Sequence, residues 1–235
     1  ILVKGSILVK SEFTKMILPA GSFFGVCDLA KGHYMADYIT AEDSVLYIFA
    51  EVKNESITIN HNAMLSTRLH NAINAQINAE FWSAYLYLAM SLDAETKGYK
   101  GVANWFYVQF QEEQDHARIF MNYLNSVEAK VELKPIEGVQ TTWDSVLDMF
   151  KSTLEHEKKV SALIRNLMKI AKEDCDYAAE SKLKWFIEEQ VEEEEAARDI
   201  IFAVESVGNS KNDMYILDKE LATRVYTEPA PLAGK

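Results

Sequence analysis

The spacing of apolar residues along the chain changes near residue 63. Before that point apolar and polar residues alternate, as in "ILVKGSILVK", and runs such as "SVLYIFAEV" are separated by turn-like segments including "LPAGSFFG" and "KNES". This two-residue period is typical of β-strands. After that point apolar residues recur every three or four positions, which is typical of amphipathic helices. We therefore predict two domains, a small β-rich domain over residues 1–62 and a helical domain over residues 63–235.

Glycine, proline and polar clusters divide the second domain into four long helices and a short fifth one. We predict the long helices over residues 65–94, 102–127, 143–172 and 177–207, and the short helix over residues 214–226. Thr141 or Thr142 is the candidate N-cap of the third helix. The connections between the long helices are short, then long, then short. This order predicts two antiparallel helix pairs joined by one full-length crossover, as in one class of four-helix bundle.

Carboxylates interrupt the core-facing stripe of every long helix near its middle, and the second helix adds a histidine. The interrupting residues are Glu80, Glu113, His116, Glu157 and Glu193. Burying one unpaired carboxylate costs several kcal/mol, so four would exceed a typical total stability of roughly 5–15 kcal/mol. The bundle must therefore keep protons there, break its pattern or bind cations. Acidic runs such as "EEQVEEEEAARD" and "LEHEKK" are, taken singly, also typical of solvated helix faces.

The chemistry of these side chains favours a divalent first-row metal such as iron or manganese. One imidazole among many carboxylate oxygens suits such a metal, and Cys27 and Cys175 form no CxxC pair for zinc. Glu113 and His116 lie one helical turn apart and can hold one metal, while Glu113 can also reach a second metal about 3.5–4 Å away. Di-iron bundles usually carry a second ExxH, but here Gln190 and Glu193 take its place. One side of the site should therefore hold its metal more loosely.

The net charge of the chain limits its partners. A charge of -12 at pH 7 disfavours nucleic acid and anionic membranes and attracts cations. No apolar run reaches the roughly 18 residues that indicate a membrane span. We therefore expect neither nucleic acid nor a membrane as a partner.

Residues 64–226 resemble a bacterial non-haem ferritin along their whole length, through "NAEFWSAYLYLAM", "QEEQDH", "HEKKV", "KWFIEEQVEEEE" and "YILDKELAT". The resemblance implies a mainly α, ferritin-like four-helix bundle with a long crossover and a short fifth helix, assembled as a hollow shell of 24 subunits. It implies a cytoplasmic iron-storage protein with ferroxidase activity, using O2 or H2O2. Haem is not expected, because Gln114 stands where bacterioferritins carry a haem-binding methionine.

The resemblance also assigns residues to iron, as Fe2+ and Fe3+. The first iron of a dinuclear centre takes Glu80, Glu113 and His116, and the second takes Glu113, Glu157 and Glu193, with Gln190 nearby. A third, inner iron takes Glu112, Glu189, Glu192 and Glu193. Two further residues match redox-active aromatic residues of the family, namely Tyr87 and Trp185.

Residues 1–62 resemble the later strands of a cyclic-nucleotide-binding β-roll, with "FFGVCDLA" at the place of its phosphate-binding cassette. Val26 stands where that family has its ribose-binding glutamate, and the phosphate-binding arginine is absent, with Tyr34 or Met35 near its place. The first strands of such a roll are missing, which fits a truncated start. We expect the fold without the nucleotide, and a surface for a protein partner. An unrelated small β-domain is the alternative.

Two other functions stay open at this point. The chain could be a di-iron oxidase of an organic substrate, which would need an apolar channel beside the metals. It could also be a structural shell protein whose β-domain recruits a partner.

Overall fold

The computed structural model of the chain divides into two compact units, Ile1–Asn62 and Ala63–Lys235. The structure describes residues 65–233 and, before them, five strands. These strands are β1 (Leu2–Lys4), β2 (Ser6–Lys10), β3 (Lys15–Pro19), β4 (Asp37–Thr40) and β5 (Val45–Leu46).

The first unit contains antiparallel strand pairs. Strand β2 lies between β3 and β4, with Leu8 opposite both Ile17 and Ile39, and β1 pairs with β5. These strands agree with the alternating pattern of the sequence. The cassette segment, with Val26, Tyr34 and Met35, lies outside the described residues, so the resemblance to a cyclic-nucleotide-binding roll stays a prediction.

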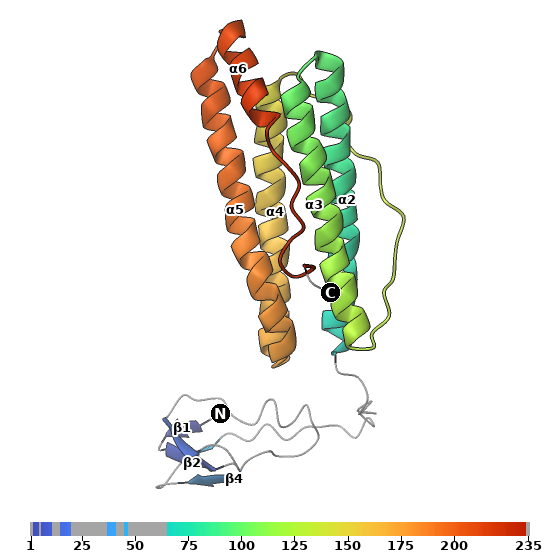
Figure 1. Ribbon diagram of the computed structural model, residues 1–235. Helices are drawn as coiled ribbons and strands as arrows, with labels where there is room; N and C mark the ends of the chain where they lie inside the picture. Colours follow the sequence, from blue (N-terminus) through green and yellow to red (C-terminus); the bar gives the residue numbers. More distant parts are fainter. Residues whose placement is uncertain are drawn as a thin grey trace. The chain divides into compact units, whose positions relative to one another are not determined.

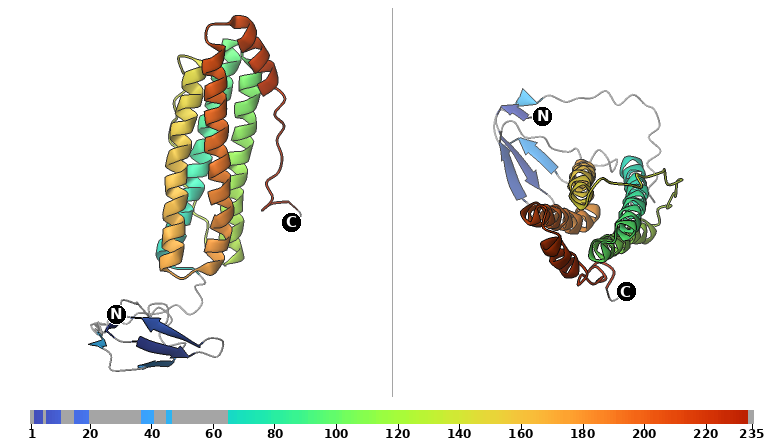
Figure 2. Two further views of the ribbon diagram at one scale, coloured as in Figure 1. Left: turned by 90° about the vertical axis from the view of Figure 1, so that its left-hand side faces the viewer. Right: turned by 90° about the horizontal axis from the view of Figure 1, so that it is seen from above.

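The second unit is a bundle of four long helices with a short fifth helix at one end (Figure 1). The helices are α2 (Thr67–Lys97), α3 (Lys100–Ser126), α4 (Val146–Glu173), α5 (Tyr177–Val207) and α6 (Lys211–Leu221). A tight turn joins α2 to α3 and another joins α4 to α5, while the crossover runs the length of the bundle between these pairs (Figures 1 and 2). The predicted topology is confirmed, and α5 has the predicted bounds.

Side-chain caps set the helix starts, and one of them corrects the sequence analysis. Ser145, not Thr141 or Thr142, caps α4, because its hydroxyl accepts from the Asp148 N–H at 3.1 Å. The residues before it are held outside the helix, since Asp93 accepts from the backbone N–H of the buried Trp143 at 2.9 Å. The start of α4 is therefore fixed by a long-range contact that local spacing does not reveal.

Helix α6 also differs from its predicted range of 214–226. It begins after the N-cap Ser210 and ends at Leu221. It packs on the start of α3, where Asp218 Oδ1 accepts from Gly101 N at 2.8 Å and Val102 N at 3.0 Å. A Cβ at Gly101 would lie 1.5 Å from the Asp218 carbonyl oxygen, so this approach requires glycine.

The crossover is tied to α2 by two asparagines. Asn74 accepts from Glu132 N at 2.7 Å and donates to Lys130 O at 3.1 Å. One turn later, Asn78 accepts from Lys134 N at 2.7 Å and donates to Glu132 O at 3.0 Å. Each amide thus pairs with backbone groups as a neighbouring strand would, which holds the crossover extended along the bundle.

The interior of the bundle has two apolar clusters. The first includes Leu69, Ile73, Ile77, Phe120, Leu124, Ile164 and Phe186. The second includes Met90, Val102, Phe106, Met149, Phe150 and Leu217. Along each long helix, the residues that join one cluster are separated from those that join the other by the buried polar residues of the mid-helix. Among the described helices, none is long and apolar enough to span a lipid bilayer.

Candidate metal centre

A layer of polar side chains crosses the bundle between the two apolar clusters. All four long helices contribute, and each of its side chains is at most 6% exposed: Glu80, Glu113, His116, Glu157, Gln190 and Glu193. The structure therefore brings together the mid-helix residues that the sequence analysis selected. The alternative of a solvated acidic face is wrong for Glu157, Gln190 and Glu193, the layer residues that lie in the two acidic runs.

Glu80, Glu113 and His116 form one compact group of the layer. Each offers one ligand atom, and these atoms lie within 4.8 Å of one another. Glu113 Oε2 lies 3.4 Å from His116 Nδ1. Within the described part of the chain, Glu80 Oε2 and Glu113 Oε2 are buried without a hydrogen-bond partner. Buried acceptors are rarely left so, and two of them beside an imidazole suit a divalent cation.

Glu157 is positioned by neutral donors from the other helices. The Tyr87 hydroxyl donates to its Oε1, and Gln190 Nε2 donates to its Oε2 at 3.0 Å. Gln190 also donates to the Glu157 carbonyl oxygen at 3.3 Å. The glutamine that replaces the expected histidine in α5 therefore serves to orient a carboxylate of α4.

Glu193 is held by Gln109, one turn before Glu113 on α3. The Gln109 Nε2 lies 2.8 Å from both carboxylate oxygens of Glu193 and 3.4 Å from Glu113 Oε1. One amide group thus bridges two carboxylates on neighbouring helices. On α2, a second glutamine holds a single carboxylate of the layer: Gln76 Nε2 donates to Glu80 Oε1 at 2.9 Å.

Burial dominates the electrostatics of the layer. It raises the pKa of Glu80, Glu113 and Glu193, and raises that of Glu157 to about 8. Burial would lower the pKa of His116, but the negative charges of nearby carboxylates, that of Glu113 first, outweigh it and leave that pKa well above its ordinary value. Without a cation, the layer therefore holds protons that a divalent metal would displace.

A second group contains His116, Glu189 and Glu193, whose ligand atoms also lie within 4.8 Å of one another. Glu189 Oε1 is 3.9 Å from His116 Nε2. The other two residues expected at a third iron are placed differently. Glu192 is exposed, and Glu112 is paired with Arg224 at 2.5 Å.

The aromatic residues that the sequence singled out flank the layer. Tyr87 is fully buried, and the pKa of its phenol is raised, first by burial and then by the charge of Glu157. The Trp185 ring lies 5.6 Å from the His116 ring, edge to face. Both aromatic residues thus contact groups of the layer.

Three residues in contact with the layer or next to it were not selected from the sequence as functional: Gln76, Gln109 and Arg224. Gln76 and Gln109 each precede a layer glutamate by four positions, Glu80 and Glu113 respectively, so helical spacing could have revealed them. Arg224 follows α6 in an irregular segment, where no periodic pattern marks it.

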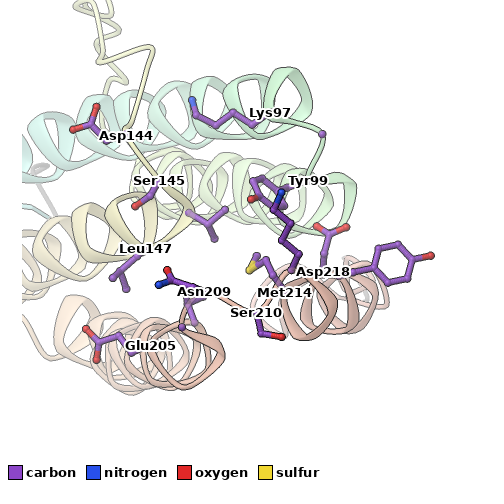
Figure 3. A pocket seen from close by; sticks show the side chains of 16 residues that line it. Lys97, Tyr99, Asp144, Ser145, Leu147, Glu205, Asn209, Ser210, Met214 and Asp218 are labelled. Atoms are coloured by element: carbon purple, nitrogen blue, oxygen red, sulfur yellow. The ribbon is translucent and has the colours of Figure 1, made fainter.

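The described bundle also has an open pocket of about 1010 Å³ at the end near α6 (Figure 3). It is lined by residues including Lys97, Tyr99, Leu147, Asn209 and Met214, which lie at the ends of helices and in the loops joining them. No residue of the polar layer lines it. This pocket therefore gives no support to an organic substrate bound beside the layer.

Residues 70–206 match the family described as Ferritin-like domain. The bacterial non-heme ferritin of Staphylococcus aureus (strain MRSA252) is 38% identical over 165 residues, 70% of this chain and 99% of that protein. That of Staphylococcus haemolyticus (strain JCSC1435) is also 38% identical over 165 residues, with the same two shares covered. An open-pore ferritin from the hyperthermophilic archaeon Archaeoglobus fulgidus is similar in structure, with 39% identity and a TM-score of 0.68, over 68% of this chain and 99% of that one.

Proposed function

The chain belongs to the ferritin family, and on that premise we propose that it oxidises Fe(II) to Fe(III) at the polar layer and stores the product as a mineral. The observation that carries this proposal is the group formed by Glu80, Glu113 and His116. Two carboxylate oxygens there are buried without a donor, in the middle of an otherwise apolar core. Burying such groups costs free energy, and a bound cation would offset that cost.

In this proposal iron is the substrate, and the protein supplies geometry and charge. Glu80, Glu113 and His116 bind one Fe(II), and Glu113, Glu157 and Glu193 bind the other. Glu113 is the shared ligand because it stands beside His116 and because the charge of Glu157 acts on it. The carboxyl groups with raised pKa give up their protons as iron binds.

The electrons come from the two irons, each of which loses one. Reduction of O2 by these two electrons and two protons yields H2O2, and reduction of H2O2 in the same way yields two molecules of water. Gln109, Tyr87 and Gln190 hold the carboxylates during these steps, since each donates to a carboxylate oxygen without adding charge. Fe(III) then leaves the layer toward an acidic surface, of which Glu189 and Glu192 are the first residues.

The proposal extends to the assembly. We propose a hollow shell of 24 copies in the cytoplasm, with the first unit as a surface for a protein partner. The match covers 99% of the S. aureus ferritin but only 70% of this chain. The remaining 30% of this chain therefore has no counterpart in that protein.

Aerobic addition of Fe(II) to the purified assembled protein tests this function. We expect fast oxidation of two irons per chain, followed by uptake of many more irons in soluble form. The Glu113→Ala variant is the matched control, since it removes the shared ligand and should leave only slow oxidation. An iron product that precipitates at the rate seen without protein would contradict the proposal.

A further inference from the structure

The segment after α6, residues 222–233, lies along α3 and is called the strap below (Figures 1 and 2). Successive residues of the strap contact successive positions along α3. Asn104 donates to the Arg224 carbonyl oxygen at 2.9 Å, Tyr226 donates to Asp115, and Arg118 pairs with Glu228 at 3.0 Å. Leu232 then packs into the first apolar cluster. Contacts along its whole length thus fix the strap.

Arg224 is the strap residue that reaches the edge of the polar layer. Its guanidinium donates to Glu112 Oε2 at 2.5 Å, to Gln109 Oε1 at 2.9 Å and to the Trp105 carbonyl oxygen at 3.2 Å. It also stacks on the Trp105 ring, with its Cζ 4.3 Å from the ring centre. A planar group with five donors suits this set of acceptors, and the side chain is only 24% exposed.

These contacts fix the orientation of Gln109. A guanidinium only donates, so the oxygen of the Gln109 amide must face Arg224. Its NH2 group must then face the layer, where it lies 2.8 Å from both oxygens of Glu193. Arg224 therefore positions Glu193 through one intervening amide.

The same guanidinium supplies a positive charge to an acidic corner of the layer. The charges of Glu193 and Glu189 both act on Glu112, as does that of Arg224 with the opposite sign. Here the resemblance to ferritins implied a third iron, yet Glu112 is paired with Arg224, and the compact second group contains only His116, Glu189 and Glu193. The guanidinium of Arg224 therefore already supplies a positive charge beside these carboxylates.

We propose that Arg224 is a tethered cation that takes the place of a third metal and limits each chain to two bound divalent metals. It is a positioning residue as well, because it orients Gln109 toward Glu193. This inference rests on the proposed function, since it concerns the count of metals at the same layer.

Calorimetric titration of the metal-free assembled protein with Zn2+ alone tests the count without any oxidation. We expect two Zn2+ per chain for the wild type and three for Arg224→Ala, because Glu112 becomes available beside Glu189 and Glu193. The double variant Arg224→Ala/Glu112→Ala should return to two. Glu228→Ala removes another strap contact but leaves Arg224 in place, so it should also bind two.

Gln109→Ala separates the two roles of Arg224. It should weaken one of the two Zn2+ sites by roughly 10- to 100-fold, as the loss of groups that orient ligands does, while the count stays at two. A count of three for Gln109→Ala would show that a loosened Glu193, not a freed Glu112, admits the extra metal, and would overturn the inference.

The wild-type protein distinguishes this inference from the proposed function. Three Zn2+ per chain would overturn the inference and leave the function standing, whereas no bound Zn2+ would remove both. If Arg224→Ala does not assemble, Glu112→Gln decides the matter. It should still bind two Zn2+, and the loss of a metal would show that Glu112 is a ligand in the wild type.

Discussion

The hydroxyl of Tyr87 on α2 donates a hydrogen bond to Glu157 on α4, across the polar layer. Both side chains are buried, and Gln190 holds the other oxygen of the same carboxylate at 3.0 Å. Glu157 is therefore fixed from two helices before any metal binds. An aromatic residue that packs in the second apolar cluster thus also orients a proposed iron ligand.

Removing the Tyr87 hydroxyl should leave the Glu157 carboxylate less well oriented, while the aromatic ring still packs in the core. We expect Tyr87→Phe to weaken Zn2+ binding at one of the two sites by about tenfold, since ligand-orienting groups are typically worth 10- to 100-fold in affinity. Calorimetry on the metal-free protein measures this. Phe110→Leu, a change at a partly buried residue of α3, is the control. Equal affinities for Tyr87→Phe and the wild type would show that Glu157 needs no such support.

Adjacent glutamates on α3 should differ sharply in their effect on iron oxidation. Glu113→Ala should abolish the fast phase of Fe(II) oxidation while the shell still assembles, because both proposed irons lose a ligand. Glu112→Ala should have a smaller effect, since Glu112 is rotated by about 100° and faces Arg224. Stopped-flow absorbance after mixing with aerobic Fe(II) compares the two. Similar rates for both variants would contradict the assignment of Glu113.

The stability of the metal-free bundle should fall as the pH rises from about 4.5 to about 8. The pKa of Glu157 is raised to about 8 by burial, above an unfolded value near 4.5, so protons bind the folded state more tightly. Their contribution is complete below the unfolded pKa and is lost as the pH passes through the folded pKa. Melting temperatures across this range measure the effect.

The variant Glu157→Gln provides the comparison for this pH dependence. It keeps the shape of the side chain and removes its titration, so its melting temperature should fall less over the same range. Saturating Zn2+ should raise the melting temperature of the wild type at pH 8 by mass action. If Zn2+ had no such effect, the carboxylates of the layer would not be metal ligands.

Gly101→Ala should release α6 from the bundle. The new Cβ would lie 1.5 Å from the Asp218 carbonyl oxygen, so α6 must move away. Asp218 then loses its hydrogen bonds to two backbone N–H groups, each worth roughly 1.5–3 kcal/mol to a charged acceptor. Hydrogen exchange of α6 should become faster in this variant. Gly138→Ala is the matched control, because nothing lies within 4 Å of its added Cβ.

Cyclic nucleotides should bind the first unit weakly or not at all. Val26 stands in place of a ribose-binding glutamate, and residues 1–62 contain no arginine for the cyclic phosphate. Losing both contacts lowers affinity on the order of 100-fold or more. Titration of the full chain with cyclic AMP and cyclic GMP by calorimetry measures this, and micromolar binding would make the unit a nucleotide sensor.

The helix pattern and the polar layer were predictable from sequence because both repeat at helical spacing. Each of Glu80, Glu113, Glu157 and Glu193 interrupts an apolar stripe, and the stripes align because the four helices are of similar length. The start of α4 was misplaced for a physical reason. Asp93 holds Trp143 outside the helix through a contact from a distant part of the chain, and spacing within a helix carries no record of such a contact.

Arg224 was unpredictable for a related reason. It lies in an irregular segment, and its partners Glu112 and Gln109 are more than a hundred positions earlier in the chain. Glu112 was assigned to a third iron through the resemblance to ferritins, and only the structure shows that a guanidinium already pairs with it. The proposed count of two metals at the layer therefore rests on a residue far from it in sequence.

The hydrogen bonds from Asn74 and Asn78 to the crossover have an evolutionary consequence. On the crossover, both asparagines bind only backbone groups, namely N–H and carbonyl groups of Lys130, Glu132 and Lys134. A contact made through the backbone does not depend on which amino acid supplies it, except that proline lacks the N–H. The crossover is therefore free to diversify in sequence while its path stays fixed. We expect homologues that keep the two asparagines to vary most at the exposed crossover side chains, such as Leu133 and Ile136.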